Sequence, residues 1–170
     1  MNSGVVRYPE HVRGDSILLI WGGSDIHPSL YDRENQGSIV GINKSERDII
    51  EWDLLQAAIN KRLMIIGICR GAQMLCAAAG GILIQDALGH GYSHMMTTKE
   101  NEHIQTSSLH HQLMYPWNIE HKLFAWHSPK TWEPENYSGL TVQEQLKIQA
   151  KERFGLNRIL RIWDELVFNG

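Results

Sequence analysis

The segment best suited to covalent chemistry in this sequence is Gly67-Ile68-Cys69-Arg70-Gly71. It joins the apolar run Leu63–Ile68 to Gly71–Ala79, a run of small residues typical of a closely packed helix. A nucleophile between a strand and a helix has a strained backbone, and flanking glycines relieve the crowding. The pattern therefore predicts that Cys69 is a nucleophile presented on a sharp turn.

The expected chemistry of Cys69 follows from its place at the beginning of a helix. The positive end of the helix dipole favours thiolate over thiol, and the thiolate is the reactive form. The backbone N–H of Arg70 would face the oxyanion formed when Cys69 attacks a carbonyl. The spacing alone leaves open that Cys69 is a small buried residue and that the glycines only serve packing. Cys76 lies among alanines two turns later and is predicted to be core.

Two adjacent glycines, Gly22-Gly23, directly follow the apolar run Ser16–Trp21. The order strand, helix, strand, helix predicts an α/β fold with a parallel sheet, and Ile82–Ile84 is expected to be a short strand or a loop. Loops at the carboxyl ends of parallel strands meet at one edge, so Gly22-Gly23 and Cys69 are expected side by side. The pair would supply a second oxyanion donor or form a plain tight turn.

Capping residues mark two helices. Ser45 is a good N-cap for an apolar-striped helix that extends to Ile59. Thr141 and Glu144 have the spacing of a capping box, which predicts a helix from Thr141 to Arg153. Arg158–Phe168 has an amphipathic pattern that is also compatible with a helix, whereas the stretch from His90 to His111 is polar and irregular.

Four segments together resemble class I glutamine amidotransferase-like proteins. They are GGSDIHPSLY (Gly22–Tyr31), RDIIEWDLLQAA (Arg47–Ala58), IIGICRGAQMLCAAAGGILIQD (Ile65–Asp86) and SSLHHQ (Ser107–Gln112). The resemblance is strongest to the γ-glutamyl-γ-aminobutyrate hydrolase branch, including versions carried by bacteriophages. It implies a three-layer, flavodoxin-like sandwich with a mostly parallel central sheet. We expect residues 1–170 to form one such domain, incomplete at both ends.

The resemblance also implies roles for individual residues. Cys69 would attack the γ-carbonyl of glutamine or another γ-glutamyl amide and form a γ-glutamyl thioester. The oxyanion hole would consist of the Arg70 amide with Gly22 and Gly23, and Gln73 would hold the glutamyl part of the substrate. Further substrate-binding residues would be Ser108, Leu109, His110 and His111. The residues Asp25, Arg47 and Asp48 also match family positions and are expected to order loops.

The general base that a cysteine hydrolase needs is not identified. In the family it is a histidine within His-Pro-Glu, a tripeptide that this sequence lacks, and His127-Ser128-Pro129 comes too early to replace it. Three hypotheses stay open: a truncated product, a different histidine as base, or a pocket without catalysis. The candidate histidines are His94, His110 and His111. A binding or scaffold protein, and a glutaminase subunit that delivers ammonia to a synthetase, are the alternative functions.

The composition narrows the class of partner. A net charge of −3 argues against nucleic acid, and no apolar run is long enough to span a bilayer. Two cysteines and a Met1–Gly14 segment without an apolar core favour a reducing, cytoplasmic setting. His90 and His94 have the i,i+4 spacing of metal ligands, but Gly89 and Gly91 argue against a helix there and no Glu or Cys lies at ligand spacing to them, so no metal site is expected. No cofactor is expected either. The expected partner is a small γ-glutamyl substrate, with a homodimer or a synthetase as further options.

Overall fold

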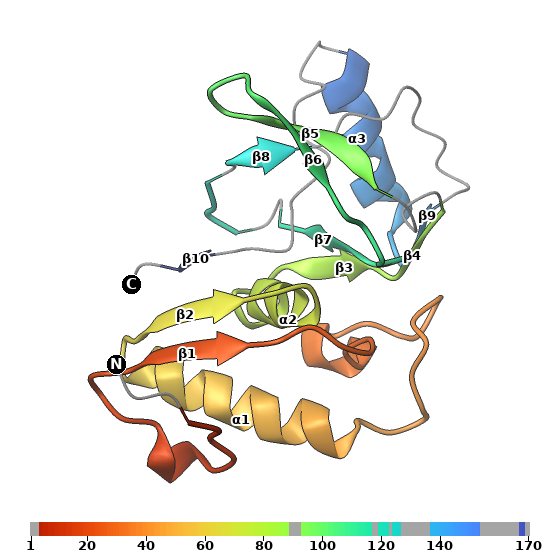
Figure 1. Cartoon of the computed structure of the whole chain (residues 1–170). Coiled ribbons are helices and arrows are strands. Elements are labelled where there is room, and N and C mark those ends of the chain that lie inside the picture. The colour runs from red at the N-terminus through yellow and green to blue at the C-terminus, as the bar shows by residue number, and fades with distance from the viewer. Residues whose placement is uncertain are drawn as a thin grey trace.

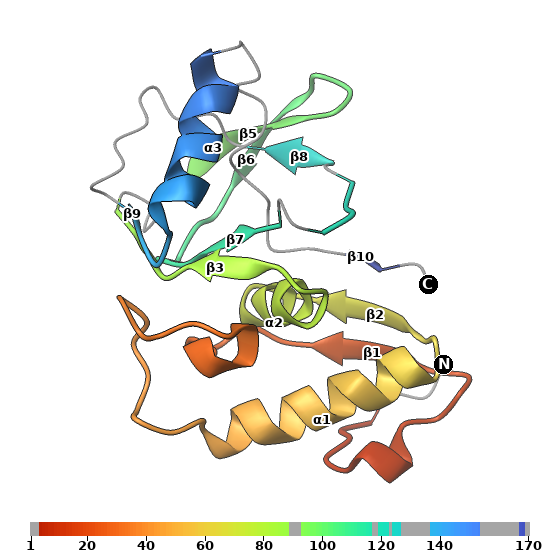
Figure 2. The same ribbon diagram turned by 180° about the vertical axis from the view of Figure 1, so that it is seen from behind.

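A computed structural model of the chain describes residues 4–88, 93–116, 119–122, 124–126, 137–153 and 167–168. The described residues form an α/β arrangement (Figure 1). One half of the molecule is formed by residues 4–78 and the other half mostly by the described residues between 94 and 153, with the strands Ile82–Ile84 and Leu113–Tyr115 between the two halves. Figure 2 shows the same division from behind.

The first half begins with the predicted order of strand, helix, strand and helix. These elements are β1 (Ile17–Ile20), α1 (Glu46–Asn60), β2 (Met64–Gly67) and α2 (Arg70–Ala78). The strands β1 and β2 pair in parallel, with Ile17 opposite Met64 and Ile20 opposite Gly67. A parallel pair needs a crossover connection, which α1 provides. The predicted parallel pairing is therefore confirmed for these two strands.

The predicted N-terminus of α1 is also confirmed. The Ser45 hydroxyl accepts a 3.0 Å hydrogen bond from the Asp48 N–H, and the Asp48 carboxylate accepts one of 3.0 Å from the Ser45 N–H. This reciprocal pair is a capping box, which satisfies two N–H groups at the start of the helix. Asp48 is only 2% exposed, which is unusual for a capping carboxylate and indicates a second role.

The other described strand pairs are antiparallel, unlike the mostly parallel sheet expected from the resemblance. They join β3 (Ile82–Ile84) to β7 (Leu113–Tyr115), β4 (Asp86–Ala87) to β9 (Tyr137–Ser138), β5 (His94–Thr98) to both β6 (His103–Thr106) and β8 (Ala125–Trp126), and β10 (Val167–Phe168) to β2. The short turn between β5 and β6 allows only antiparallel pairing. The mostly polar sequences of β5 and β6 carry no local signal for these two strands.

Three further helical elements complete the described chain. The short 3₁₀ turns η1 and η2 cover Pro9–His11 and Pro28–Tyr31, and α3 covers Val142–Arg153. The predicted capping box of α3 is confirmed, because the Thr141 N–H donates to the Glu144 carboxylate (2.8 Å) and the Glu144 N–H donates to the Thr141 hydroxyl (3.3 Å). None of the helices among the described residues has the length and apolarity needed to cross a bilayer.

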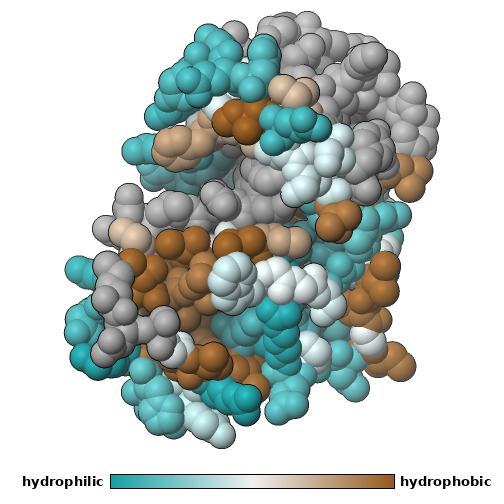
Figure 3. All heavy atoms as spheres, in the orientation of Figure 1, coloured by the Kyte–Doolittle hydropathy of each residue, from teal (hydrophilic) through white to brown (hydrophobic). Residues whose placement is uncertain are grey.

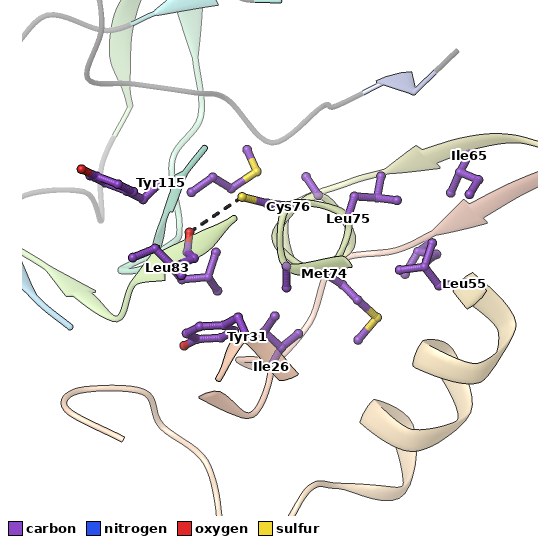
Figure 4. Packing of buried hydrophobic residues seen from close by; sticks show 14 of the residues in the cluster. Ile26, Tyr31, Leu55, Ile65, Met74, Leu75, Cys76, Leu83 and Tyr115 are labelled. Carbon is purple, nitrogen blue, oxygen red and sulfur yellow. Dashed lines mark hydrogen bonds between the residues drawn. The ribbon is translucent and has the colours of Figure 1, made fainter. Parts of the chain in front are cut away.

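The core is organised around α2 (Figure 4). Leu75 points toward Ile65 of β2, while the Cys76 thiol lies 3.7 Å from the carbonyl oxygen of Ile82 in β3. Cys76 is fully buried, as predicted, and burial raises the pKa of its thiol to about 12. Cys76 is therefore a core residue that stays protonated at neutral pH.

The outward face of β1 and β2 is apolar. Ile17, Leu19, Trp21 and Met64 are between 40% and 61% exposed. These side chains follow the two-residue alternation of a strand, so they share one face. Figure 3 shows brown side chains gathered over this part of the molecule.

Candidate active site

Cys69 occupies the sharp turn that the sequence predicts. It lies between the end of β2 and the first residue of α2, with φ 53° and ψ −110°, and it is half-buried. A residue other than glycine in such a conformation costs on the order of 1–3 kcal/mol and persists only where the surroundings enforce it. The strained turn is thus present, and Cys69 keeps partial access to solvent.

The two flanking glycines are required by close approach of backbone atoms. A Cβ on Gly67 would lie 2.5 Å from the Ala72 nitrogen, and a Cβ on Gly71 would collide with the carbonyl oxygen of Ile20 in β1. Backbone atoms of a packed strand and helix cannot move aside cheaply. The glycines therefore allow α2 to begin directly against the end of the parallel pair.

The Gly22-Gly23 loop reaches Cys69 from the neighbouring strand. A Cβ on Gly22 would lie 3.2 Å from the Cys69 Cβ and 3.7 Å from its Sγ. The Ile68 N–H donates to the Ile20 carbonyl (2.9 Å), which extends the hydrogen bonding between β1 and β2 to the residue directly before Cys69. The predicted meeting of the two loops at one sheet edge is confirmed.

Arg70 presents its backbone and its side chain to different parts of the molecule. Its N–H belongs to the first turn of α2, where N–H groups have no partner within the helix. Its guanidinium is 1% exposed and pairs with Asp48 (2.7 Å) and with Glu51, both on α1. The side chain therefore binds the two helices together, and only the backbone is suited to an oxyanion.

The structure supports the predicted loop-ordering role of Arg47. Its Nη2 donates to the carbonyl oxygens of Trp21 and Gly22, each at 3.1 Å, and its Nε donates to Glu51 at 2.7 Å. Asp48 instead serves the helix cap and the Arg70 ion pair. Sequence reasoning missed Glu51, although its four-residue spacing from Arg47 is a signal for a helical ion pair.

The segment Ser107–Gln112 lies beside α2 through Gln73. The Gln73 Nε2 donates a 3.4 Å hydrogen bond to the Gln112 carbonyl, and Gln73 is only 4% exposed. Ser108 is buried at 3% exposure, whereas Leu109 is 91% exposed. The segment therefore contacts α2, and the substrate-binding roles of its residues stay predictions.

His111 is held between two carboxylates. Its Nε2 lies 2.9 Å from Asp25 and its Nδ1 lies 3.0 Å from Asp86. A carboxylate only accepts hydrogen bonds, so both contacts are hydrogen bonds when both ring nitrogens carry a proton. Asp25 also accepts a 2.6 Å bond from the Ile39 N–H. His111 thus links the loop after β1 to β4, which suits a structural role better than that of a base.

The other two candidate bases differ in what the structure describes. His110 Nδ1 lies 2.9 Å from the Gln112 carbonyl, the same oxygen that Gln73 contacts. A carbonyl accepts, so Nδ1 carries the proton and Nε2 is the proton-accepting nitrogen of the neutral ring. The side chain of His94 and the segment His127-Ser128-Pro129 lie outside the described residues. In the part of the chain that is described, no three His, Cys, Asp or Glu side chains gather into a metal site.

Comparison with known proteins agrees with this geometry. Residues 10–115 match the family model described as Peptidase C26. A glutamine amidotransferase-like protein of Rickettsia prowazekii is 39% identical over 71 residues, which cover 42% of this chain and 25% of that protein. A glutamine amidotransferase-like protein of Lactococcus lactis is 32% identical over 89 residues, 52% of this chain and 43% of that protein.

A third relative is the γ-glutamyl-γ-aminobutyrate hydrolase of Escherichia coli, 36% identical over 69 residues, 41% of this chain and 26% of that enzyme. The chain thus matches between about a quarter and less than half of the length of these relatives. The family match, in contrast, covers more than half of the chain and contains the Cys69 turn, the Gly22-Gly23 loop and the Ser107–Gln112 segment. The chain belongs to the Peptidase C26 family of glutamine amidotransferase-like proteins.

Proposed function

We propose that this protein hydrolyses a γ-glutamyl amide through Cys69. The observation that carries the proposal is the turn itself, in which a half-exposed cysteine has φ 53° at the start of α2 and lies against Gly22. Strain of this kind concentrates at functional sites. The buried Cys76 has no comparable environment, so the chain offers one reactive thiol among its two cysteines.

The reaction follows from the groups around Cys69. The thiolate attacks the γ-carbonyl carbon, and the resulting oxyanion accepts hydrogen bonds from the Arg70 N–H and from the Gly22-Gly23 loop. The tetrahedral intermediate expels the amine, which takes up a proton, and leaves a γ-glutamyl thioester on Cys69. Water then attacks the thioester, so that glutamate is released and the thiol is restored.

His110 is the residue that we propose as the proton carrier. Its hydrogen bond to the Gln112 carbonyl fixes the tautomer in which Nε2 accepts a proton. The same carbonyl accepts from Gln73, one turn after Cys69 on α2, which brings His110 close to that helix. His111 is the weaker candidate because its two nitrogens already face carboxylates.

The γ-glutamyl-γ-aminobutyrate hydrolase branch is the finer form of the proposal. It is supported by the similarity to the Escherichia coli enzyme and by the four matching segments of the sequence. A three-layer fold of the whole domain and a reducing, cytoplasmic setting belong to the same proposal. The bacteriophage relationship stays a prediction.

A second candidate is a protein that keeps the pocket without catalysis. The pairing of His111 with two carboxylates favours it, because it engages both ring nitrogens of a candidate base. In this case Cys69 would still bind glutamine analogues but would not turn over amides. Delivery of ammonia to a synthetase is a third option, which would be favoured by glutaminase activity that appears only with a synthetase present.

The test is covalent labelling with 6-diazo-5-oxonorleucine, a reactive glutamine analogue, followed by peptide mass spectrometry. We expect one adduct, on Cys69, that excess glutamine suppresses. The variant Cys69→Ala should lose the adduct, and the matched variant Cys76→Ala should keep it. Labelling that glutamine does not suppress, or no labelling of Cys69, would contradict the proposed site.

A further inference from the structure

The Gly22-Gly23 loop is held by a side chain from α1. Arg47 Nη2 donates to two successive carbonyl oxygens, those of Trp21 and Gly22, both at 3.1 Å. Its Nη1 fills the space that a Cβ on Gly23 would occupy. Arg47 is thus in contact with both peptide units that precede Gly23.

These contacts set the direction of the loop N–H groups. The described backbone has no cis peptide bond, and in a trans peptide the C=O and N–H point in opposite directions. Because the Trp21 carbonyl faces Arg47, the Gly22 N–H points away from Arg47. The same reasoning applies to the Gly22 carbonyl and the Gly23 N–H. Both loop donors therefore face away from the guanidinium.

Cys69 approaches the loop from another side. The missing Cβ of Gly22 would meet Cys69, whereas the missing Cβ of Gly23 would meet Arg47. The loop therefore contacts Cys69 at Gly22 and the Arg47 guanidinium at Gly23.

A single carboxylate connects this loop to the nucleophile turn. Glu51 accepts from Arg47 Nε at 2.7 Å through one oxygen and pairs with Arg70 Nη1 through the other. Arg70 directly follows Cys69 in sequence and is held by Asp48 as well. Arg70, whose N–H is one expected oxyanion donor, and Arg47, which contacts the Gly22-Gly23 loop, thus bind the same carboxylate on α1.

We propose that Arg47 is a positioning residue that orients the Gly22-Gly23 N–H groups toward the oxyanion. Glu51, which binds both Arg47 and Arg70, keeps these groups aligned with the Arg70 N–H. The inference rests on the proposed function, since an oxyanion forms only when Cys69 attacks a carbonyl. The planar guanidinium is needed because it serves two carbonyls and a carboxylate at once, which a lysine ammonium at the end of a flexible chain cannot reproduce.

The experiment compares two alkylating reagents on Arg47→Lys and Arg47→Gln. A glutamine-analogue chloromethyl ketone reacts when Cys69 adds to its ketone carbon and forms an oxyanion. The sulfur then bonds to the methylene carbon as chloride leaves, and the first sulfur–carbon bond breaks as the ketone re-forms. Iodoacetamide is attacked directly at its methylene carbon and forms no oxyanion. We expect both variants to lose roughly 10- to 100-fold in the chloromethyl ketone rate, the size expected for a displaced catalytic group. The iodoacetamide rate at Cys69 should stay within about twofold.

Controls separate positioning from folding. Arg13→Gln removes another arginine that pairs with a carboxylate, Asp15, but at the surface, and should change neither rate. Gly23→Ala displaces the guanidinium without removing it and should reproduce the selective loss. Equal losses with both reagents, or no loss with the ketone, would overturn the inference.

The outcomes also distinguish the inference from the proposed hydrolysis. A wild-type protein that reacts with the ketone but never turns over γ-glutamyl amides would contradict hydrolysis, while the Arg47 comparison would still decide the inference. A wild-type protein that reacts with iodoacetamide and not with the ketone would overturn the inference itself.

Discussion

Asp48 and Arg70 form a 2.7 Å ion pair in which the side chains are 2% and 1% exposed. The pair joins α1 to α2 directly behind the Cys69 turn. Removing one partner of a buried pair leaves an uncompensated charge, which typically costs about 3–5 kcal/mol. Because Glu51 still pairs with Arg70, we expect Asp48→Asn to lower the free energy of unfolding in urea by at most about that amount.

The exposed pair Arg13–Asp15, 3.2 Å apart, is the control for this prediction. Asp15→Asn should change the stability by less than about 1 kcal/mol, because surface ion pairs contribute little. Equal effects of the two substitutions would show that the Asp48–Arg70 pair does not support the site.

Gly71 tests whether the turn depends on close packing. A Cβ there would collide with the Ile20 carbonyl oxygen, and overpacking of this kind costs typically about 1–3 kcal/mol. We expect Gly71→Ala to lower the thermal midpoint and to slow the labelling of Cys69 by 6-diazo-5-oxonorleucine. Gly14→Ala is the matched control, since no atom lies within 4 Å of its added Cβ. An unchanged labelling rate in Gly71→Ala would contradict the proposed origin of the turn.

His110 and His121 provide a matched pair for the general base. In each, Nδ1 lies 2.9 Å from a backbone carbonyl two residues away, that of Gln112 for His110 and that of Ile119 for His121. We expect His110→Gln to reduce the turnover of a γ-glutamyl anilide by about 10²–10⁴-fold, the usual contribution of acid–base catalysis. His121→Gln should leave the turnover unchanged. Full activity of His110→Gln would exclude His110 as the base.

Alkaline pH should unfold the protein through three buried groups. Burial raises the pKa of Cys76 from 9.0 to about 12 and is the main cause that raises the pKa of Tyr31 and Tyr115 from 10.0 to about 12. The unfolded chain releases these protons at lower pH, so the stabilising contribution is complete below pH 9 and is lost between about pH 9 and 12.

The measurement follows tyrosinate absorbance and circular dichroism in one titration. For Tyr31 and Tyr115 we expect ionisation to coincide with the loss of helical signal. Ionisation of both residues near pH 10 in a protein that remains folded would contradict their burial.

The sequence predicts the elements around Cys69 because their signals are local. Ser45 and Asp48 form the expected capping box, and the glycines at 67 and 71 mark the close approach of α2 to β1. The meeting of Gly22 with Cys69 follows from the parallel pairing of two apolar strands. These features depend on neighbouring residues or on one crossover, which sequence patterns report well.

Other features depend on contacts between distant segments, for which the sequence has no local signal. The placement of His111 between Asp25 and Asp86 joins residues that are 86 and 25 positions apart. The use of Glu51 by both Arg47 and Arg70 depends on how α1 packs against α2. The strands β5 and β6 are short and mostly polar, so their pairing is set by the fold around them and not by their own periodicity.

The central claim is that Cys69 forms a covalent γ-glutamyl intermediate. Its most direct test is to mix the protein with a γ-glutamyl anilide, quench the reaction in acid within the first turnover, and locate the acyl group by peptide mass spectrometry. The account predicts one γ-glutamyl group, on Cys69, that Cys69→Ala abolishes and Cys76→Ala retains. Release of the aniline by a Cys69→Ala variant at the wild-type rate, or a γ-glutamyl group on any other residue, would contradict it.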